Sequence, residues 1–194
     1  MPKLIVIFFL FYMHSVFGQG SYLDQQCVTD EEYRLYTLIN EYRSEKGLAK
    51  VPLSASLCLV AGAHAWDLHT NQPDKGKCNM HSWSDEGPWT ACCYTEDHKK
   101  AECLWMKPSE LTDYDGFGYE VSYYSSITAL QHSDIARAAL NGWKGSPGHN
   151  QIITNKNGWK RMTWQAMGVG IYGNYVVVWF GEKRDPAGKA SLCP

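Results

Sequence analysis

The stretch AMGVGIYGNYVVVWF, residues 166–180, decides the fold. Its two arms, 166–172 and 175–180, contain the β-branched and aromatic residues that favour strands. Gly173-Asn174 between them is a good two-residue turn, so the stretch predicts a β-hairpin. The second arm is apolar on both faces, which is typical of a covered strand in the middle of a sheet.

The segments before this hairpin predict helices and one further strand. Thr29 and Glu32 have the spacing of a capping box, and apolar residues recur at helical intervals after them. Gly118–Ser125 is rich in aromatic and β-branched residues and is a predicted strand. The predicted helices span residues 30–46, 54–69 and 133–143, and Pro147 separates the last from a short apolar segment after His149. This order predicts an α/β fold, a three-layer α/β/α sandwich with a central antiparallel sheet.

The N-terminus predicts export. Lys3 precedes a short apolar run, residues 4–13, and small residues follow up to Gly18, as in a secretory signal peptide covering residues 1–18. The run is too short to cross a bilayer, and no later segment predicts a membrane span. The predicted order is a segment at 19–29, one domain at 30–185 and a tail at 186–194. The formal charge of −2 gives no drive towards nucleic acid.

Seven cysteines fit an oxidising, extracellular location, where most should be paired. Cys27 and Cys193 lie near the two ends and are expected to tether them. A cysteine cluster is expected to staple a long middle loop at residues 72–114; its members are Cys78, Cys92, Cys93 and Cys103. A zinc knuckle of this cluster with His98 is disfavoured, because no paired C-x-x-C spacing occurs. The odd count predicts one free cysteine or a disulfide-linked dimer.

Two histidines and a carboxylate are the candidate site. His149 follows the proline-glycine break in Ser146-Pro147-Gly148, His81 lies in the middle loop, and Glu120 lies on the predicted strand. Neutral imidazoles suit zinc, and a carboxylate can ligate a metal or orient a water. The alternative is a hydrogen-bonded polar pocket that only fixes a cleft.

The order of motifs resembles the CAP superfamily, which comprises cysteine-rich secretory proteins, antigen 5 and pathogenesis-related class 1 proteins. The resemblance covers about residues 30–183. It rests on Asn40 and Arg43 in the first helix, on Ala63-His64-Ala65-Trp66-Asp67, on Gly118-Tyr119-Glu120, on the run from Trp143 through Ser146-Pro147-Gly148-His149, and on the closing hairpin.

The resemblance implies an α/β/α sandwich with a cleft in which two histidines and acidic residues bind a divalent metal, often zinc. Carried over, the metal ligands fall on His81, His149 and Glu120. An acidic residue usually stands three positions before the final histidine, where this chain has Ser146, and Val121 replaces the usual asparagine. The Ser-Pro-Gly-His form is closer to the bacterial-type branch. Cleft residues are thus expected at His81, Glu120, Ser146 and His149.

The other polar candidates support binding over catalysis. His64 faces inward on an alanine-rich helix and is expected to be a core histidine, whereas His69, His98 and His132 are expected at the surface. Ser146 is expected to cap the following turn. Neither a Gly-x-Ser-x-Gly elbow nor a His-Glu-x-x-His motif occurs, so the residues favour a binding protein over a hydrolase.

Aromatic residues make up 13% of the chain and can build a core or an apolar cleft wall. Core packing is the favoured interpretation for most of Trp83, Trp89, Trp105, Tyr123, Tyr124 and Trp143. Because related proteins bind sterols, fatty acids, glycans or other proteins, a lipid, sterol, glycan or protein ligand is expected. The sequence therefore predicts a secreted, disulfide-stabilised protein that acts by binding. The alternatives are a secreted hydrolase or peptidase that uses the same cleft, and a structural component of an extracellular matrix such as shell or mucus.

Overall fold

The computed structural model describes residues 27–129, 131 and 133–194. The expected signal peptide at 1–18, the stretch 19–26 and His132 lie outside the described residues. Within the described ranges, no helix combines the length and apolar character needed to cross a bilayer.

The central sheet has three antiparallel strands in the order β2-β4-β3. They are β2 (Gly118–Tyr124), β3 (Ala166–Tyr172) and β4 (Tyr175–Gly181). The β3–β4 hairpin turns at Gly173, whose φ of 55° lies in the left-handed region that favours glycine. β4 lies between the other two strands and is buried along its whole length. The predicted hairpin and its covered central strand are confirmed.

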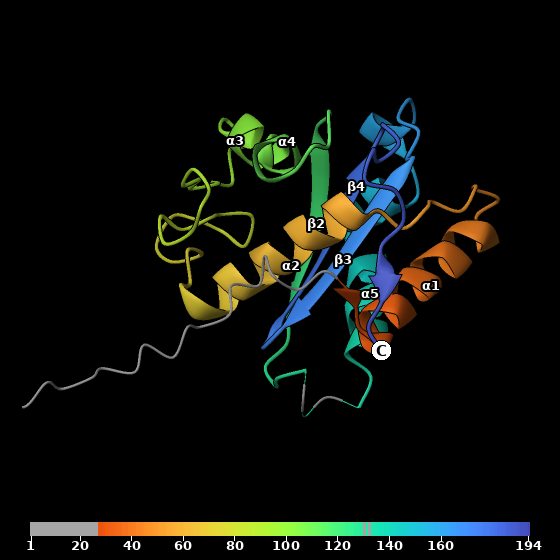
Figure 1. Cartoon of the computed structure of the whole chain (residues 1–194), viewed down its shortest axis with the longest axis horizontal. Coiled ribbons are helices and arrows are strands. Elements are labelled where there is room, and N and C mark those ends of the chain that lie inside the picture. The colour runs from red at the N-terminus through yellow and green to blue at the C-terminus, as the bar shows by residue number, and fades with distance from the viewer. Residues whose placement is uncertain (1–26, 130, 132) are drawn as a thin grey trace, which may run out of the picture.

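Helices cover both faces of this sheet (Figure 1). Alternate side chains of β4 point to opposite faces, as a strand requires. Val177 and Trp179 pack with α2 (Ala55–Thr70), whereas Val176, Val178 and Phe180 share a core with α1 (Asp30–Glu45) and α5 (Ile135–Gly145). The α/β/α sandwich predicted from the order of segments is confirmed.

The glycines of β3 allow α2 to lie directly on the sheet. A Cβ atom added at Gly168 would come within 2.0 Å of the Leu57 carbonyl carbon, and one at Gly170 within 2.4 Å of the Ala61 carbonyl carbon. Both contacts are to helix backbone, so neither site accepts a larger residue unless the helix moves. This close approach fixes the height of α2 above the sheet.

Several element boundaries carry information about the site. The capping box of Thr29 and Glu32 starts α1, as predicted. The segment after Ser146 is a short helix, α6 (Pro147–Ile153), with a proline in its first turn, followed by a 3-10 turn, η2 (Asn157–Trp159). Ser146 occupies the N-cap position of α6, but its side chain makes no capping hydrogen bond, so the expected side-chain cap is wrong.

The middle region is more structured than expected. Two short helices, α3 (Ala101–Trp105) and α4 (Lys107–Leu111), interrupt the predicted 72–114 loop. Disulfides Cys78–Cys93 and Cys92–Cys103 tie this region together, so the four clustered cysteines act as predicted. The helices are five residues each, too short to give a readable helical period in the sequence.

The two ends of the described chain are joined. Disulfide Cys27–Cys193 lies beside a short parallel pair, β1 (Cys27–Val28) with β5 (Ser191–Leu192), which confirms the predicted tether. The remaining cysteine, Cys58, is free and buried on α2, with 8% of its surface exposed. The structure therefore does not support a dimer linked through an odd cysteine, because this sulfur cannot reach another chain without local opening.

Candidate functional site

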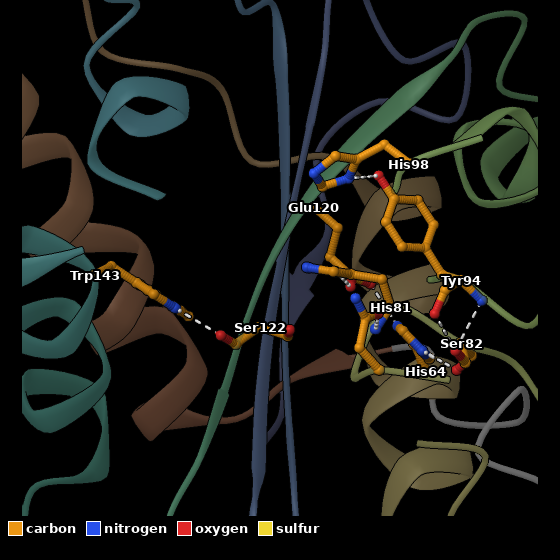
Figure 2. A network of polar contacts seen from close by, with 9 residues as sticks. His64, His81, Ser82, Tyr94, His98, Glu120, Ser122 and Trp143 are labelled. Atoms are coloured by element: carbon orange, nitrogen blue, oxygen red, sulfur yellow. Dashed lines mark hydrogen bonds and ion pairs between the residues drawn. The ribbon is translucent and has the colours of Figure 1, made fainter. Parts of the chain in front are cut away.

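Glu120 is the centre of the candidate site. It lies on β2 opposite Trp179 of β4, and the alternation of the strand turns its side chain towards α2. Its carboxylate is fully buried, and each oxygen is hydrogen-bonded to a different imidazole. Figure 2 shows His64 and His81 converging on this carboxylate.

His64 holds one carboxylate oxygen from α2. Its Nδ1 is hydrogen-bonded to Oε2 of Glu120, and its Nε2 donates to the backbone carbonyl of Ser82 at 2.9 Å. The ring is completely buried and stacks on Trp83, with ring centroids 4.3 Å apart and planes 6° apart. Since both nitrogens face acceptors, an ionised Glu120 requires His64 to be an imidazolium. His64 was expected to be a core histidine with its hydrogen bonds satisfied, and this is confirmed. Its hydrogen-bond partner Glu120, however, is the central residue of the candidate site.

His81 holds the other oxygen from the middle region. Its Nδ1 lies 2.8 Å from Oε1 of Glu120, and its backbone N–H donates to the side-chain oxygen of Asn79. The side chain is 21% exposed, unlike the buried His64. A proton on Nδ1, directed at the carboxylate, leaves the Nε2 lone pair of a neutral imidazole as the free ligand atom.

His149 and Ser146 reach the same place from α6. His81, Glu120, Ser146 and His149 all line one cavity of about 500 Å³. The structure thus brings together the four cleft residues proposed from sequence, although they come from three separate parts of the chain. Their role in binding stays a prediction.

The sequence interpretation missed several cavity residues, such as Tyr119 and Trp159 of the apolar lining and His98 and Tyr94 of the polar lining. His98 was expected only at the surface; it is exposed, but it also lines the cavity, and its Nδ1 is 3.0 Å from the Tyr94 hydroxyl. Tyr94 lies edge-on to His81. Both residues belong to the disulfide-tied region, whose backbone path has no readable period, so no sequence signal placed them here.

The charges in this site are set by burial and by the imidazoles. Burial alone would raise the pKa of Glu120, but His64 and His81 outweigh it and hold that pKa below its usual value. Burial opposes a charge on His64, yet the adjacent Glu120 carboxylate raises its pKa. Burial, with a smaller contribution from His81, lowers the pKa of His149. The site therefore combines a buried ion pair with a neutral imidazole facing the cavity.

Imidazole is the cavity-lining group whose chemistry suits a divalent transition metal. Within the part of the chain that the structure describes, no three His, Cys, Asp or Glu side chains form a ready-made metal cluster. Both Glu120 oxygens accept hydrogen bonds from imidazoles. The carboxylate therefore orients the ring of His81 from the side opposite its free nitrogen. The imidazoles that line the cavity belong to His81, His98 and His149.

The aromatic candidates lie in three places: the core, the cavity and, for Tyr124, the exposed surface outside the cavity. Trp83, Trp89 and Trp143 are buried in the core, as expected. Trp143 donates from Nε1 to the Ser122 carbonyl, which ties α5 to the strand that carries Glu120 (Figure 2). Trp105 instead lines the cavity.

One solved structure agrees with this architecture. An extracellular protein containing an SCP domain from Bacillus anthracis superimposes with a TM-score of 0.52 at 21% identity, over 79% of this chain and 40% of that one. A cysteine-rich secretory protein from Staphylococcus aureus gives 0.48 at 18% identity, over 79% and 39%. This chain spans less than half the length of either bacterial protein. An outer surface protein from Borrelia burgdorferi gives 0.49 at 18%, over 79% and 93%.

A search of curated proteins found no match. The sequence model of one family does match, and it spans residues 36–178, from the first helix to the central strand of the sheet. That span includes every cleft residue described above. The chain belongs to the CAP family, the cysteine-rich secretory protein family.

Proposed function

We propose that this protein is a secreted binding protein that holds a divalent cation, with zinc as the best fit, between His81 and His149. The observation that carries the proposal is that both imidazoles line one cavity while Glu120 fixes the ring of His81 from behind. A carboxylate, an imidazole and a metal in series form a recurring arrangement in zinc proteins.

The contacts define the part of each residue. Glu120 accepts from Nδ1 of His81 at 2.8 Å, which selects the tautomer whose Nε2 is free for a ligand. His64 holds the second carboxylate oxygen, so Glu120 cannot rotate away from His81. His149 supplies the second imidazole from α6. A bound zinc ion would supply Lewis acidity at this point, and water or a second ligand would complete its coordination.

Secretion is part of this proposal. Three disulfides tie the described chain, and structural disulfides persist in oxidising, extracellular surroundings. The superimposable Bacillus anthracis protein is described as extracellular. Expression of the chain with residues 1–18 present, followed by mass measurement of the protein in the medium, tests both export and removal of these residues.

Zinc titration calorimetry tests the metal site. We expect wild-type protein to take up one zinc ion per chain, and the double variant His81→Ala/His149→Ala to lose that uptake. His69→Ala is the matched control, because His69 does not line the cavity but packs edge-on to Tyr172. Unchanged uptake in the double variant, with an intact circular dichroism spectrum, would show that these imidazoles do not hold the metal.

A further inference from the structure

The side chains that line the cavity containing His81 and His149 are of two chemical kinds. The polar side includes the imidazoles, hydroxyls and amide of His81, His98, His149, Tyr94, Ser146 and Gln151. The apolar side is formed by Leu104, Trp105, Tyr119, Ile152 and Trp159. A metal ion with its waters needs only the first side. The apolar side therefore calls for a further, organic occupant.

The apolar side is a continuous aromatic wall. The ring centroid of Tyr119 lies 5.5 Å from that of Trp105 and 5.0 Å from that of Trp159. Trp105 also lies beside Phe117, whose side chain is 46% exposed, so the wall continues to the surface. Trp105 and Trp159 are half-buried, which leaves part of each indole available. Such a wall accepts a flat ring by stacking or edge-to-face contact.

The charges of the side chains that line the cavity favour one kind of polar head group on such a ligand. Among the described residues that line the cavity, none is Lys or Arg. The carboxylate of Glu120 is buried and already accepts from two imidazoles. A ligand carboxylate would lose its hydration without gaining a fixed cationic partner, which is costly. An ammonium group would instead meet imidazole acceptors and the negative faces of aromatic rings.

We propose that the metal-free cavity binds a small aromatic amine, with its ring against Trp105, Tyr119 and Trp159 and its amine donating to His81 or His149. The inference rests on the proposed binding role of the same cavity and names its organic ligand class. A volume of about 500 Å³ is ample for a single ring with a two-carbon amine chain.

The test compares two probes that differ only in the head group. Phenethylamine and 3-phenylpropionate carry the same ring and two-carbon chain, one ending in an ammonium and the other in a carboxylate. Each is titrated by calorimetry into the full protein after removal of metal with EDTA and desalting. We expect the amine to bind at least about tenfold more tightly than the carboxylate. Equal or tighter binding of the carboxylate, or no binding of the amine, overturns the inference.

Variants locate the amine. Trp159→Ala is expected to lower the affinity for phenethylamine at least about fivefold, since the substitution removes one side of the aromatic wall. Trp105→Leu is the second variant of the wall, in case Trp159→Ala perturbs the fold. Tyr124→Ala is the matched control, because this exposed ring is not part of the cavity lining. Unchanged affinity in both folded tryptophan variants overturns the placement.

Zinc titration of the same samples separates this inference from the proposed function. If zinc uptake depends on His81 and His149 but no amine binds, the proposed metal site is supported and the proposed amine ligand is contradicted. Amine binding that depends on Trp159, together with zinc uptake that ignores both histidines, supports the aromatic site and removes the metal site.

Discussion

A buried ion pair organises the site at the scale of single residues. His64 and Glu120 have no exposed side-chain surface, and they are bonded to one another and to Ser82 and His81. A buried pair is stable only when its remaining hydrogen-bonding positions are filled, and here they are. The aromatic face of Trp83 adds a favourable contact to a cationic His64. Removing one charge of the pair should therefore lower the free energy of unfolding.

The variant Glu120→Gln tests this cost. Gln keeps the shape of Glu but leaves His64 buried without a counter-ion, so we expect the free energy of unfolding to fall by about 3 kcal/mol. Urea unfolding followed by circular dichroism measures it. The matched control is Asp97→Asn, which removes an exposed pair with Lys99 and should lower the free energy of unfolding far less, because water screens an exposed pair. A loss for Glu120→Gln no larger than that of the control would mean that the buried pair is not ionised.

The same pair predicts how stability depends on pH. The pKa of His64 is raised in the fold, so its contribution is complete below about pH 6.5 and is lost as pH rises through the folded pKa. The pKa of Glu120 is lowered, so its contribution is present above its ordinary value of about 4.3 and is lost as pH falls through the folded pKa. Stability attributable to the pair therefore peaks between these two limits.

Comparison with His64→Gln isolates the alkaline side of this profile. As pH rises above about 6.5, wild-type protein should lose more unfolding free energy than the variant, which has no proton to release at this position. Urea unfolding at a series of pH values gives both slopes. Parallel slopes for the two proteins would show that His64 does not change its protonation on unfolding in this range.

Helix α2 and strand β3 set the geometry of the site at the scale of elements. α2 carries His64, and Gly168 and Gly170 let it lie against β3. β2 carries Glu120, and its register with β4 places that residue opposite Trp179. The distance between His64 and Glu120 is therefore set by the close contact between α2 and β3. At this contact β3 contributes only the glycines, which have no side chain.

The substitution Gly168→Ala tests this contact. The added Cβ would lie 2.0 Å from the Leu57 carbonyl carbon, so the helix backbone must move, and we expect a loss of about 3 kcal/mol in unfolding free energy. Gly145→Ala is the control, because nothing lies within 4 Å of its added Cβ. Thermal and urea unfolding report both, and a Gly168→Ala protein as stable as wild type would contradict the close approach.

Sequence patterns predicted the long elements well and the middle region poorly. The capping box at Thr29 placed the start of α1, and β-branched residues with Gly173-Asn174 placed the hairpin, because these signals are local. The short α3 and α4 carry no such signal; disulfides and tertiary contacts hold them. For the same reason His98 and Tyr94 were not foreseen in the cavity, whereas His81, Glu120 and His149 were placed by the ordered family motifs.

At the scale of the whole molecule, three disulfides pair six cysteines, and burial protects the free thiol of Cys58. Cys27–Cys193 closes a sequence separation of 166 residues, and the other two bridges hold the region around His98. Long closed loops give the largest entropic stabilisation. Cys58 stands apart from these bridges: it is buried on α2, and burial raises the pKa of its thiol to about 12. A thiol with this pKa contains almost no thiolate near neutral pH, which makes it unreactive.

The oxidised protein should therefore run as a monomer on non-reducing gels. A thiol reagent such as DTNB should label no cysteine in the native protein and one per chain after unfolding in guanidinium, since only Cys58 is unpaired. A disulfide-linked dimer, or fast labelling of the native protein, would contradict the burial of this sulfur.

The central claim is that His81 and His149 present one ligand site in a shared cavity, with Glu120 behind it. An anomalous difference map from a zinc-soaked crystal, recorded at the zinc absorption edge, tests it most directly. The account predicts a single strong peak in the cavity, bonded to one nitrogen of each histidine while Glu120 still contacts Nδ1 of His81. A map from saturated crystals with no peak between these imidazoles, or with zinc bound only at other residues, would contradict it.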